Sequence, residues 1–397
     1  MPAYQLQSFT LASAMGHGIA ASLQALRKGQ SGIRRTRWET VDLNTCIGEV
    51  SGVDAVRLPE SLRPFDCRNN RLACMTLELD GFGAAVRAAV QRLGPLRVGV
   101  FLGTSTSGIL ASELAYRQRD PATGALPASL DYRHTHNSFS VADFVRQYFK
   151  LQGPAVVVAT ACSSGAKVFG NAQRLMALGL IDAAIVGGVD SLCLTTLYGF
   201  NSLQLISSQP CRPFDEHRDG ITIGEAAAFA LLERVDHAEP GGIVLGGIGE
   251  SSDAHHMSSP HPQGLGAQQA MAKALAMAGL QPSDIDYVAL HGTSTPSNDA
   301  AEDKALSSLF GHSPPCSSIK GHTGHTLGAA GAVNAAVCAL ALQHDFAPGG
   351  VGTTQLDPAL NSRYLLRTLE QPMRHTLSNS FGFGGSNCSL VLSKVGA

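Results

Sequence analysis

Short apolar runs rich in β-branched residues alternate along the chain with Ala-rich segments whose apolar positions follow helical spacing. Apolar runs of about four to eight residues, bounded by Gly, Pro or polar residues, are typical of buried strands. The predicted strands are 97–102, 155–160, 183–186, 227–232, 243–248, 287–290, 374–380 and 388–392. Because strands and helices alternate in this way, the sequence predicts an α/β architecture.

The two parts of the chain share a weakly similar pattern of predicted elements. A strand, a short loop and an Ala- and Gly-rich helix occur at 155–179 and again at 316–342. The turn-forming run Pro240-Gly241-Gly242 lies between the two copies. We therefore expect a duplication, with one half at 1–240 and the other at 241–397.

Candidate chemistry begins at the end of the strand that precedes Cys162. The run Val157-Val158-Ala159-Thr160-Ala161-Cys162-Ser163-Ser164-Gly165 leads into a predicted helix from Ala166 to about Leu178. Cys162 would then lie at a helix N-terminus, where unpaired N–H groups and the helix dipole favour a thiolate. Small residues after it would let a substrate approach, as a nucleophile requires. Taken alone, a cysteine in an apolar setting is more often a buried structural residue.

Two histidine motifs change that balance. His291 opens the motif His-Gly-Thr-Ser-Thr-Pro after a predicted strand, and His325 closes the motif Lys-Gly-His-Thr-Gly-His that starts at Lys320. A glycine-rich segment, 379–387, follows near the end of the sequence. Either histidine alone would be an ordinary loop or core residue, whereas the combination with Cys162 is specific.

These motifs together resemble the β-ketoacyl-acyl-carrier-protein synthases, the condensing enzymes of the thiolase superfamily. The segments 30–33, 211–215 and 252–257 resemble further motifs of this family, so the likeness covers nearly the whole chain. The resemblance implies a thiolase-like, five-layered αβαβα fold built from two duplicated halves. The half at 1–240 would carry the nucleophile, and the half at 241–397 would carry the two histidines.

The resemblance also implies a mechanism. Cys162 would accept an acyl group from a thioester, while the backbone N–H groups of Cys162 and Phe383 hold the oxyanion. His291 and His325 would donate to the enolate that forms when a malonyl thioester loses carbon dioxide. Lys320 would keep both histidines neutral by charge repulsion rather than act as the base. Phe383, flanked by glycines, would also serve as a gate.

Further residues are expected to bind the substrate and its carrier. Thr293 and Thr295 match family hydroxyls that bind the pantetheine amides, and Thr106 stands where relatives line the acyl pocket. A hydroxyl at that position is unfavourable for long saturated chains unless it finds a partner. The expected docking residues for an acidic acyl carrier protein are Arg63, Arg68, Arg71 and Arg212. The segment 67–71 resembles condensing enzymes of aryl polyene pathways.

Composition limits the other possibilities. The 397 residues carry a formal net charge of −2, which gives no basic field for nucleic acid. Nine cysteines occur without a C-x-x-C pair, which favours reduced thiols in the cytoplasm. We expect no apolar run long enough to span a membrane, no leader and no metal or cofactor site, since no phosphate-binding loop or recognised metal-ligand spacing is present.

Three functions remain open at this point. The chain is expected to be an elongating ketosynthase of fatty acid synthesis, a ketosynthase dedicated to a polyene or other specialised chain, or a non-catalytic chain-length partner of another ketosynthase. Such partners typically lose the nucleophile, so the retention of Cys162, His291, Lys320 and His325 argues against the third function. A homodimer or a heterodimer with a related chain-length subunit is expected, with 134–149 reaching the partner's pocket.

Overall fold

The structure is a computed structural model, and it describes residues 2–35 and 38–396. Among these residues, an eleven-stranded sheet has the order β11-β10-β14-β15-β9-β1-β8-β6-β4-β5, with β2 (Gly16–His17) attached to β1. The first five strands along the chain on this path are β1 (Ala3–Ser13), β4 (Val98–Gly103), β5 (Ala155–Val158), β6 (Ala183–Asp190) and β8 (Ala226–Val235). The other five are β9 (Ile243–Ser252), β10 (Tyr287–Ala289), β11 (Cys316–Ser317), β14 (His375–Gly382) and β15 (Ser386–Lys394).

The strand order is the same in both halves of the sheet when each is followed from its outer edge. From one edge the order is β5-β4-β6-β8-β1, and from the other it is β11-β10-β14-β15-β9. In each half the three outer strands are parallel and the two inner strands are antiparallel. The halves join where β1 pairs with β9 over two residue pairs. This repeated connectivity supports the expected duplication.

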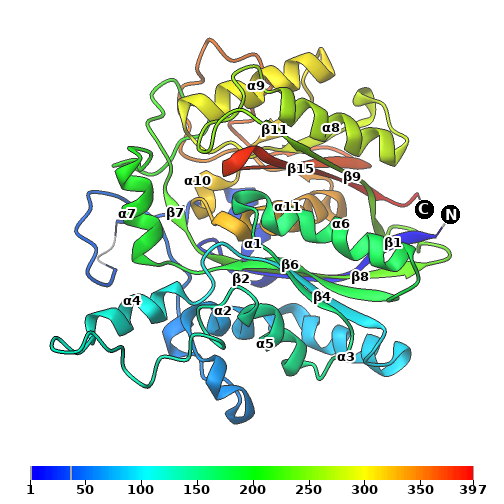
Figure 1. The fold of residues 1–397 in the computed structure, drawn as a ribbon. Helices are drawn as coiled ribbons and strands as arrows, with labels where there is room; N and C mark the ends of the chain where they lie inside the picture. The colour runs from blue at the N-terminus through cyan, green and yellow to red at the C-terminus, as the bar shows by residue number, and fades with distance from the viewer. Residues whose placement is uncertain (1, 36–37, 397) are drawn as a thin grey trace.

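Five layers follow from this arrangement (Figure 1). The helices α6 (Ser164–Ala177) and α11 (Ala330–His344) pack on each other in the central layer, between the two halves of the sheet. On the outer face of the first half lie α2 (Arg68–Leu77), α3 (Phe82–Leu93) and α5 (Ser140–Tyr148). On the outer face of the second half lie α8 (Leu265–Ala278) and α9 (Pro296–Phe310). The predicted thiolase-like fold is therefore confirmed.

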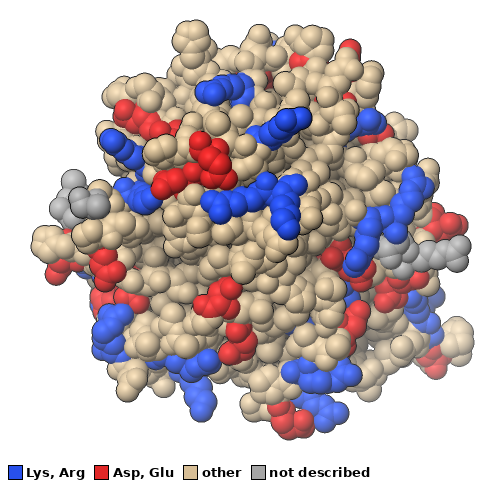
Figure 2. Space-filling model, turned by 180° about the vertical axis from the view of Figure 1, so that it is seen from behind, with Lys and Arg blue, Asp and Glu red and all other residues tan. Residues whose placement is uncertain are grey.

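Four further helices and two small sheets complete the described part of the chain. The other helices are α1 (Gly18–Lys28), α4 (Ile109–Arg117), α7 (Leu194–Ser202) and the short α10 (Lys320–Thr323). Two small sheets pair β3 (Ile47–Gly48) with β7 (Ile223–Gly224) and β12 (Phe346–Ala347) with β13 (Leu369–Glu370). On the face opposite to that of Figure 1, Lys and Arg side chains are interspersed with Asp and Glu (Figure 2).

The core explains one departure from the sequence expectations. The segment Leu327–His344, which contains α11, is long and apolar enough to cross a membrane, although no such run was expected. In the structure 89% of it is buried, and α11 is buried from Ala330 to Leu342. A helix that is apolar on all sides needs neighbours on all sides, and here the two halves of the sheet provide them. Its burial is that of a core helix.

The predicted strands are all present, but their ends differ by a few residues. The strand expected at 155–160 ends at Val158, and the strand expected at 243–248 continues to Ser252. The helix expected from Ala166 begins at Ser164. It starts earlier because the chain turns directly after β5, in the segment that carries Cys162.

Candidate active site

A tight turn between β5 and α6 presents Cys162. Residues Ala161–Ser163 form a single 3₁₀ turn, and Ala161 has the left-handed φ of 51°, an unusual conformation for a residue with a side chain. Gly165, in the first turn of α6, lies so close to Gly328 that an added Cβ would be 2.6 Å from the Gly328 carbonyl oxygen. The close packing brings the start of α6 against the loop that carries the second histidine.

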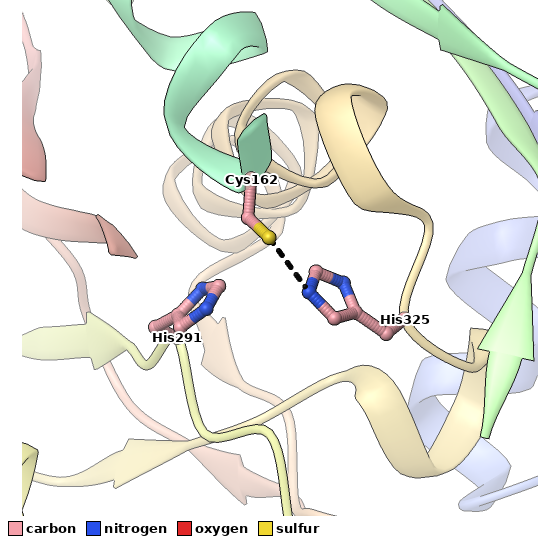
Figure 3. A group of neighbouring side chains, drawn as sticks. All are labelled: Cys162, His291 and His325. Carbon is pink, nitrogen blue, oxygen red and sulfur yellow. Dashed lines mark hydrogen bonds between the residues drawn. The ribbon is translucent and has the colours of Figure 1, made fainter. Parts of the chain in front are cut away.

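The two histidines reach Cys162 from loops in the other half of the chain. His291 follows β10, and His325 lies between α10 and α11. The His325 Nε2 atom is 3.1 Å from the Cys162 Sγ atom, and the rings of His291 and His325 are 5.4 Å apart and nearly perpendicular (Figure 3). One ligand-type atom from each of the three residues lies within 4.8 Å of those of the other two. The structure thus brings together the three residues that the motifs singled out.

Neighbouring groups determine which nitrogen of each ring faces the pocket. The Leu327 backbone N–H donates to His325 Nδ1 at 3.3 Å, so the proton of a neutral His325 belongs on Nε2. Lys320 Nζ is 3.5 Å from His291 Nδ1 and also donates to the His291 carbonyl oxygen. Since Lys320 can only donate, His291 too is a neutral ring with its proton on Nε2. Both rings can therefore act as hydrogen-bond donors.

Burial and charge keep these rings neutral. Burial, followed by the positive charge of Lys320 and by the other histidine, lowers the pKa of His291 well below its usual value. Burial and then Lys320 lower the pKa of His325 in the same way. Burial also lowers the pKa of Lys320 itself, against the opposing effect of Glu302. Lys320 thus lies where its charge can keep both rings neutral, and this role stays a prediction.

Cys162 differs from its expectation in one respect. Burial raises the pKa of the Cys162 thiol to about 11, although Lys320 and the Phe383 backbone N–H act in the opposite direction. The helix terminus was expected to favour a thiolate, but Cys162 is only 5% exposed, and this loss of solvent favours the thiol. The backbone N–H groups of Phe383 and Cys162 lower the pKa of the thiol, and their role as oxyanion donors stays a prediction.

A pocket opens over the three residues. Its apolar wall is formed by Phe200, Leu205, Ile221, Phe381 and Phe383. Ser259 and Ser297 in the lining are exposed, and the other polar lining residues are Asp253, Ser258, Thr293, Thr295, Asn298 and Asn387. A site with an apolar wall and a polar entrance suits a ligand that has an apolar end and a polar arm.

Hydrogen bonds join the Phe383 loop to the loop at 253–261. Gly384 N–H donates to the Met257 carbonyl oxygen at 2.7 Å, and the Asn387 side chain donates to Asp253 at 2.8 Å. The Phe383 ring packs 5.5 Å from the ring of Phe200. Gly384 has a φ of 79°, which a residue with a side chain would rarely adopt. Phe383 therefore lies on a segment that closes one side of the pocket.

Thr293 and Thr295 both line the pocket, and their binding of the pantetheine amides stays a prediction. Their hydroxyl oxygens are 2.9 Å apart, and Thr295 Oγ1 also accepts from the Asn298 backbone N–H at the start of α9. One of the two hydroxyl protons is used in the bond between them. The pair therefore keeps one O–H donor and free lone pairs for a ligand.

Thr106 lies outside the lining of this pocket. Its hydroxyl donates to Asp190 at 2.8 Å and accepts from the Ser191 backbone N–H at 3.1 Å. The hydroxyl therefore has the partners that a buried polar group needs, and its contact with an acyl chain stays a prediction.

The four arginines expected to dock a carrier protein differ in their surroundings. Arg68 is buried and bonds to Glu225 at 2.6 Å and Asp54 at 2.8 Å, so it is unsuitable for docking. Arg71 pairs with Asp66, and exposed Arg63 pairs with Glu60. Arg212 is half-buried, and its Nε is buried without a hydrogen-bond partner among the described residues. Only the expectation for Arg68 is contradicted.

Buried acids support the site, and the sequence reasoning missed them. Glu302 accepts the backbone N–H groups of His291 and Gly292 at 2.9 and 2.7 Å, and burial raises its pKa to about 7. Asp190 accepts from Thr104, from two backbone N–H groups of the loop after β4 and from Gly328. The only available signal was an acidic side chain within an otherwise apolar or Ala-rich stretch.

Comparisons with known proteins agree with this geometry. The sequence model described as "Beta-ketoacyl synthase, N-terminal domain" matches residues 9–238, and the one described as "Beta-ketoacyl synthase, C-terminal domain" matches residues 243–354. The mitochondrial 3-oxoacyl-[acyl-carrier-protein] synthase of Arabidopsis thaliana is 39% identical over 270 residues, which span 63% of this chain and 59% of that protein. The 3-oxoacyl-[acyl-carrier-protein] synthase 2 of Coxiella burnetii is 30% identical over 96% of both chains.

A solved structure extends the likeness to the whole fold. A chain in the structure of a ketosynthase in complex with its chain length factor, from Xenorhabdus doucetiae, superimposes with a TM-score of 0.91. It is 36% identical in sequence, and the match covers 99% of this chain and 98% of that one.

Proposed function

Because the chain belongs to the β-ketoacyl synthase family, we propose that it is a ketosynthase that condenses an acyl thioester with malonyl-acyl-carrier-protein and releases carbon dioxide. The observation that carries the proposal is the meeting of Cys162, His291 and His325 at the inner end of one pocket. The product is a 3-oxoacyl-carrier-protein that is two carbons longer than the starting acyl group.

The first half-reaction transfers the acyl group to Cys162. The sulfur forms a bond to the thioester carbonyl carbon, the bond to the carrier sulfur breaks, and the thiol proton leaves with the carrier sulfur. The negative oxygen of the intermediate is held by the backbone N–H groups of Cys162 and Phe383. His325 Nε2–H, 3.1 Å from the sulfur, stabilises the thiolate as it forms.

The second half-reaction uses the two neutral histidines. The bond between the malonyl α-carbon and its carboxylate breaks, carbon dioxide leaves, and the electron pair forms an enolate. The Nε2–H groups of His291 and His325 donate to the enolate oxygen. The enolate carbon then bonds to the acyl carbonyl carbon, and Cys162 leaves as a thiolate that takes up a proton.

The same geometry weighs against a purely structural chain-length partner. A partner that only shapes another subunit's pocket has no need of a thiol 3.1 Å from an imidazole or of a buried lysine beside a second imidazole. It also has no need of two N–H groups directed at that thiol. We therefore favour the catalytic subunit over the non-catalytic partner.

The proposed partners are an acyl carrier protein and a second chain. Thr293 and Thr295 offer one donor and free lone pairs at the pocket entrance, which suits the amides of a phosphopantetheine arm. Exposed Arg63, together with Arg71 and Arg212, is retained as a docking candidate for the acidic carrier. Phe383 is retained as the gate.

The edge of the sheet supports pairing with a second chain. β5 lies at one end of the strand order with β4 as its only neighbour there, and its four apolar residues are only half-buried. An apolar edge strand exposes unpaired backbone groups unless another chain covers it. We propose a dimer across this edge, with 134–149 near the partner, either of identical chains or with a chain length factor. Light scattering at micromolar concentration tests it, and a monomeric mass both alone and with a co-expressed partner would contradict it.

The pathway and the cellular setting belong to the same proposal. Fatty acid elongation and a specialised polyene-type pathway both remain candidates. We place the reaction in the cytoplasm, supported by the nine cysteines, all of which are free in the structure. The division at 240/241 is retained as the boundary between the duplicated halves.

The test is a turnover assay with purified acyl- and malonyl-acyl-carrier-protein. Mass spectrometry should detect a 3-oxoacyl-carrier-protein two carbons longer than the primer, and Cys162→Ala should form none. A competition between saturated and polyunsaturated primers of equal length separates the two pathways. No condensed product with any primer, for a protein that is folded and paired with its partner, would refute the proposal.

A further inference from the structure

Ser294, between the two threonines at the pocket entrance, has an unusual backbone. Its φ of 68° lies in the left-handed region, which costs a residue with a side chain on the order of 1 kcal/mol. Ser294 is completely buried and does not line the pocket, whereas Thr293 and Thr295 do. The local sequence does not require such a conformation, so other parts of the molecule must hold it.

Three hydrogen bonds fix Ser294 from outside its own loop. Its N–H donates to Asp299 Oδ1 at 3.2 Å, and its hydroxyl oxygen accepts from the Arg212 backbone N–H at 2.9 Å. Its carbonyl oxygen accepts from the Gly220 backbone N–H at 3.1 Å. Every polar group of Ser294 is therefore bonded, and two of the bonds come from the segment 212–220.

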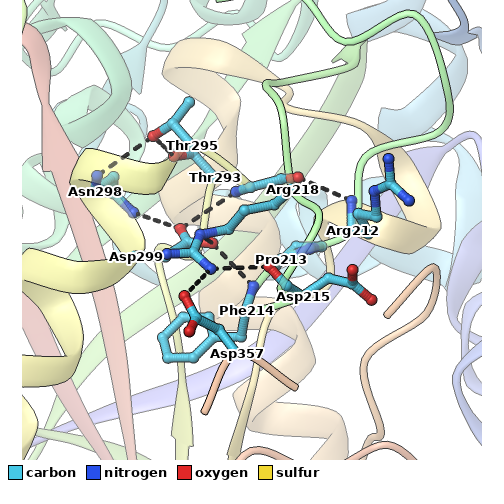
Figure 4. Close-up of polar contacts among 12 residues, drawn as sticks. Arg212, Pro213, Phe214, Asp215, Arg218, Thr293, Thr295, Asn298, Asp299 and Asp357 are labelled. Carbon is cyan, nitrogen blue, oxygen red and sulfur yellow. Dashed lines mark hydrogen bonds and ion pairs between the residues drawn. The ribbon is translucent and has the colours of Figure 1, made fainter. Parts of the chain in front are cut away.

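That segment is itself anchored by buried charges (Figure 4). Asp299 accepts the Phe214 backbone N–H at 2.9 Å, so it holds the segment 212–220 and Ser294 at once. Arg218 lies beside Asp299 at 3.6 Å, and its Nη1 donates to the Asp215 carbonyl oxygen and to Asp357. A buried ion pair with several hydrogen bonds makes a stiff support.

The effect of this support appears at the neighbouring threonines. One of the two hydroxyls donates to the other across 2.9 Å, which leaves one O–H donor for the pocket. This arrangement requires that the backbone between the two threonines keeps its turn. If Ser294 relaxed to an ordinary conformation, the Thr293 and Thr295 side chains would no longer face the same side of the loop. The segment 212–220 thus holds the turn between the two threonines without lining the pocket itself.

We propose that Ser294 is a positioning residue for the pantetheine arm, holding the Thr293 and Thr295 hydroxyls in register through its bonds to Arg212, Gly220 and Asp299. This inference rests on the proposed ketosynthase function. It assigns Ser294 to recognition of the carrier arm and leaves Cys162, which is held by other elements, unaffected.

The test compares two thioesters of the same acyl group. One is carried by pantetheine, and the other by propanethiol, which lacks both amides. For Ser294→Ala we expect the KM for acylation by the pantetheine thioester to rise about tenfold, the effect of one lost hydrogen bond. Acylation by the propanethiol thioester and alkylation of Cys162 by iodoacetamide should keep their wild-type rates.

Two further variants keep the test decisive. Ser22→Ala removes another fully buried serine hydroxyl, which bonds to the Gly18 carbonyl oxygen within α1, and it should leave both thioesters unaffected. If Ser294→Ala does not fold, Ser294→Gly takes its place, because glycine adopts the left-handed φ without strain. Glycine offers no hydroxyl to the Arg212 backbone N–H and has more backbone freedom, so the threonine hydroxyls are held less firmly and a selective but smaller rise in KM is expected.

The outcomes separate this inference from the proposed function. A wild-type protein that is acylated by pantetheine thioesters, with equal changes or no change for both thioesters in the Ser294 variants, overturns the inference alone. A wild type that forms no acyl-enzyme from either thioester overturns the proposed function and the inference together. A rise confined to the pantetheine thioester supports both.

Discussion

Replacing either histidine should slow decarboxylation far more than acylation. His291→Ala and His325→Ala each remove one of two N–H donors that face the enolate oxygen, while Cys162 and the backbone N–H groups of the oxyanion site remain. Each neutral ring is held by a neighbour on Nδ1, Lys320 in one case and Leu327 in the other, which leaves Nε2–H as the donor of each ring.

The expected magnitude follows from the loss of one donor in a buried site. Removing a single oxyanion donor elsewhere costs a factor of roughly 10² to 10³, and His291 and His325 are both buried here. Release of carbon dioxide from malonyl-carrier thioester should therefore fall by about 10² or more in each variant. Acylation of Cys162, followed by intact mass, should continue, although more slowly in His325→Ala because that ring contacts the sulfur.

His322 offers a matched control three residues before His325. Its ring nitrogens lie 2.9 Å from the Gln30 carbonyl oxygen and 3.1 Å from the Gly349 carbonyl oxygen, and it does not line the pocket. His322→Ala should lower the thermal unfolding midpoint yet decarboxylate at close to the wild-type rate below that temperature. Wild-type decarboxylation by either His291→Ala or His325→Ala would refute the role assigned to that ring.

Other predictions concern pH, metal ions and Thr106. The pKa values of His291 and His325 are lowered well below the ordinary histidine value, so both rings are already neutral at about pH 6. Decarboxylation, which needs neutral rings, should therefore not rise as the pH increases from about 6 to 8. A rise across that interval would show a ring with an ordinary pKa. Zinc could use the donor atoms of Cys162, His291 and His325, but the charge of the adjacent Lys320 opposes a second cation. A chelator should therefore leave activity unchanged. A loss of activity that added zinc restores would contradict the scheme. Thr106→Val should lower the free energy of unfolding by about 1–3 kcal/mol in denaturant titrations, since Asp190 and Ser191 lose a partner, and an unchanged value would show that the bonds are unimportant.

The strands and the three reactive residues could be predicted because their signals are local. A continuous apolar run such as β6 is buried on both faces, and this pattern is visible within a few residues. The end of β9 was misplaced because its last residues, including Glu250, pair with β15 across the sheet rather than following an apolar pattern. Pairing between distant segments overrides local preference there.

The errors at the site share a different cause, which is distance along the chain. Arg68 seemed a surface cation, but its partner Glu225 lies 157 residues away. The hydroxyl of Thr106 seemed unpaired, but Asp190 lies 84 residues away. The pKa of Cys162 depends on burial by both halves of the fold, and that burial outweighs the helix terminus that the sequence does reveal. The role of Ser294 could not be predicted, because no sequence pattern indicates a left-handed backbone at a serine.

The central claim is that Cys162 carries the acyl group. The protein should be incubated with an acyl-carrier thioester and no malonyl donor, and its intact mass and peptides then measured. We predict a mass increase equal to one acyl group, located on the peptide that contains Cys162, and its loss when malonyl-carrier thioester is added. An acyl group on any other residue, or equal acylation of Cys162→Ala, would contradict the account.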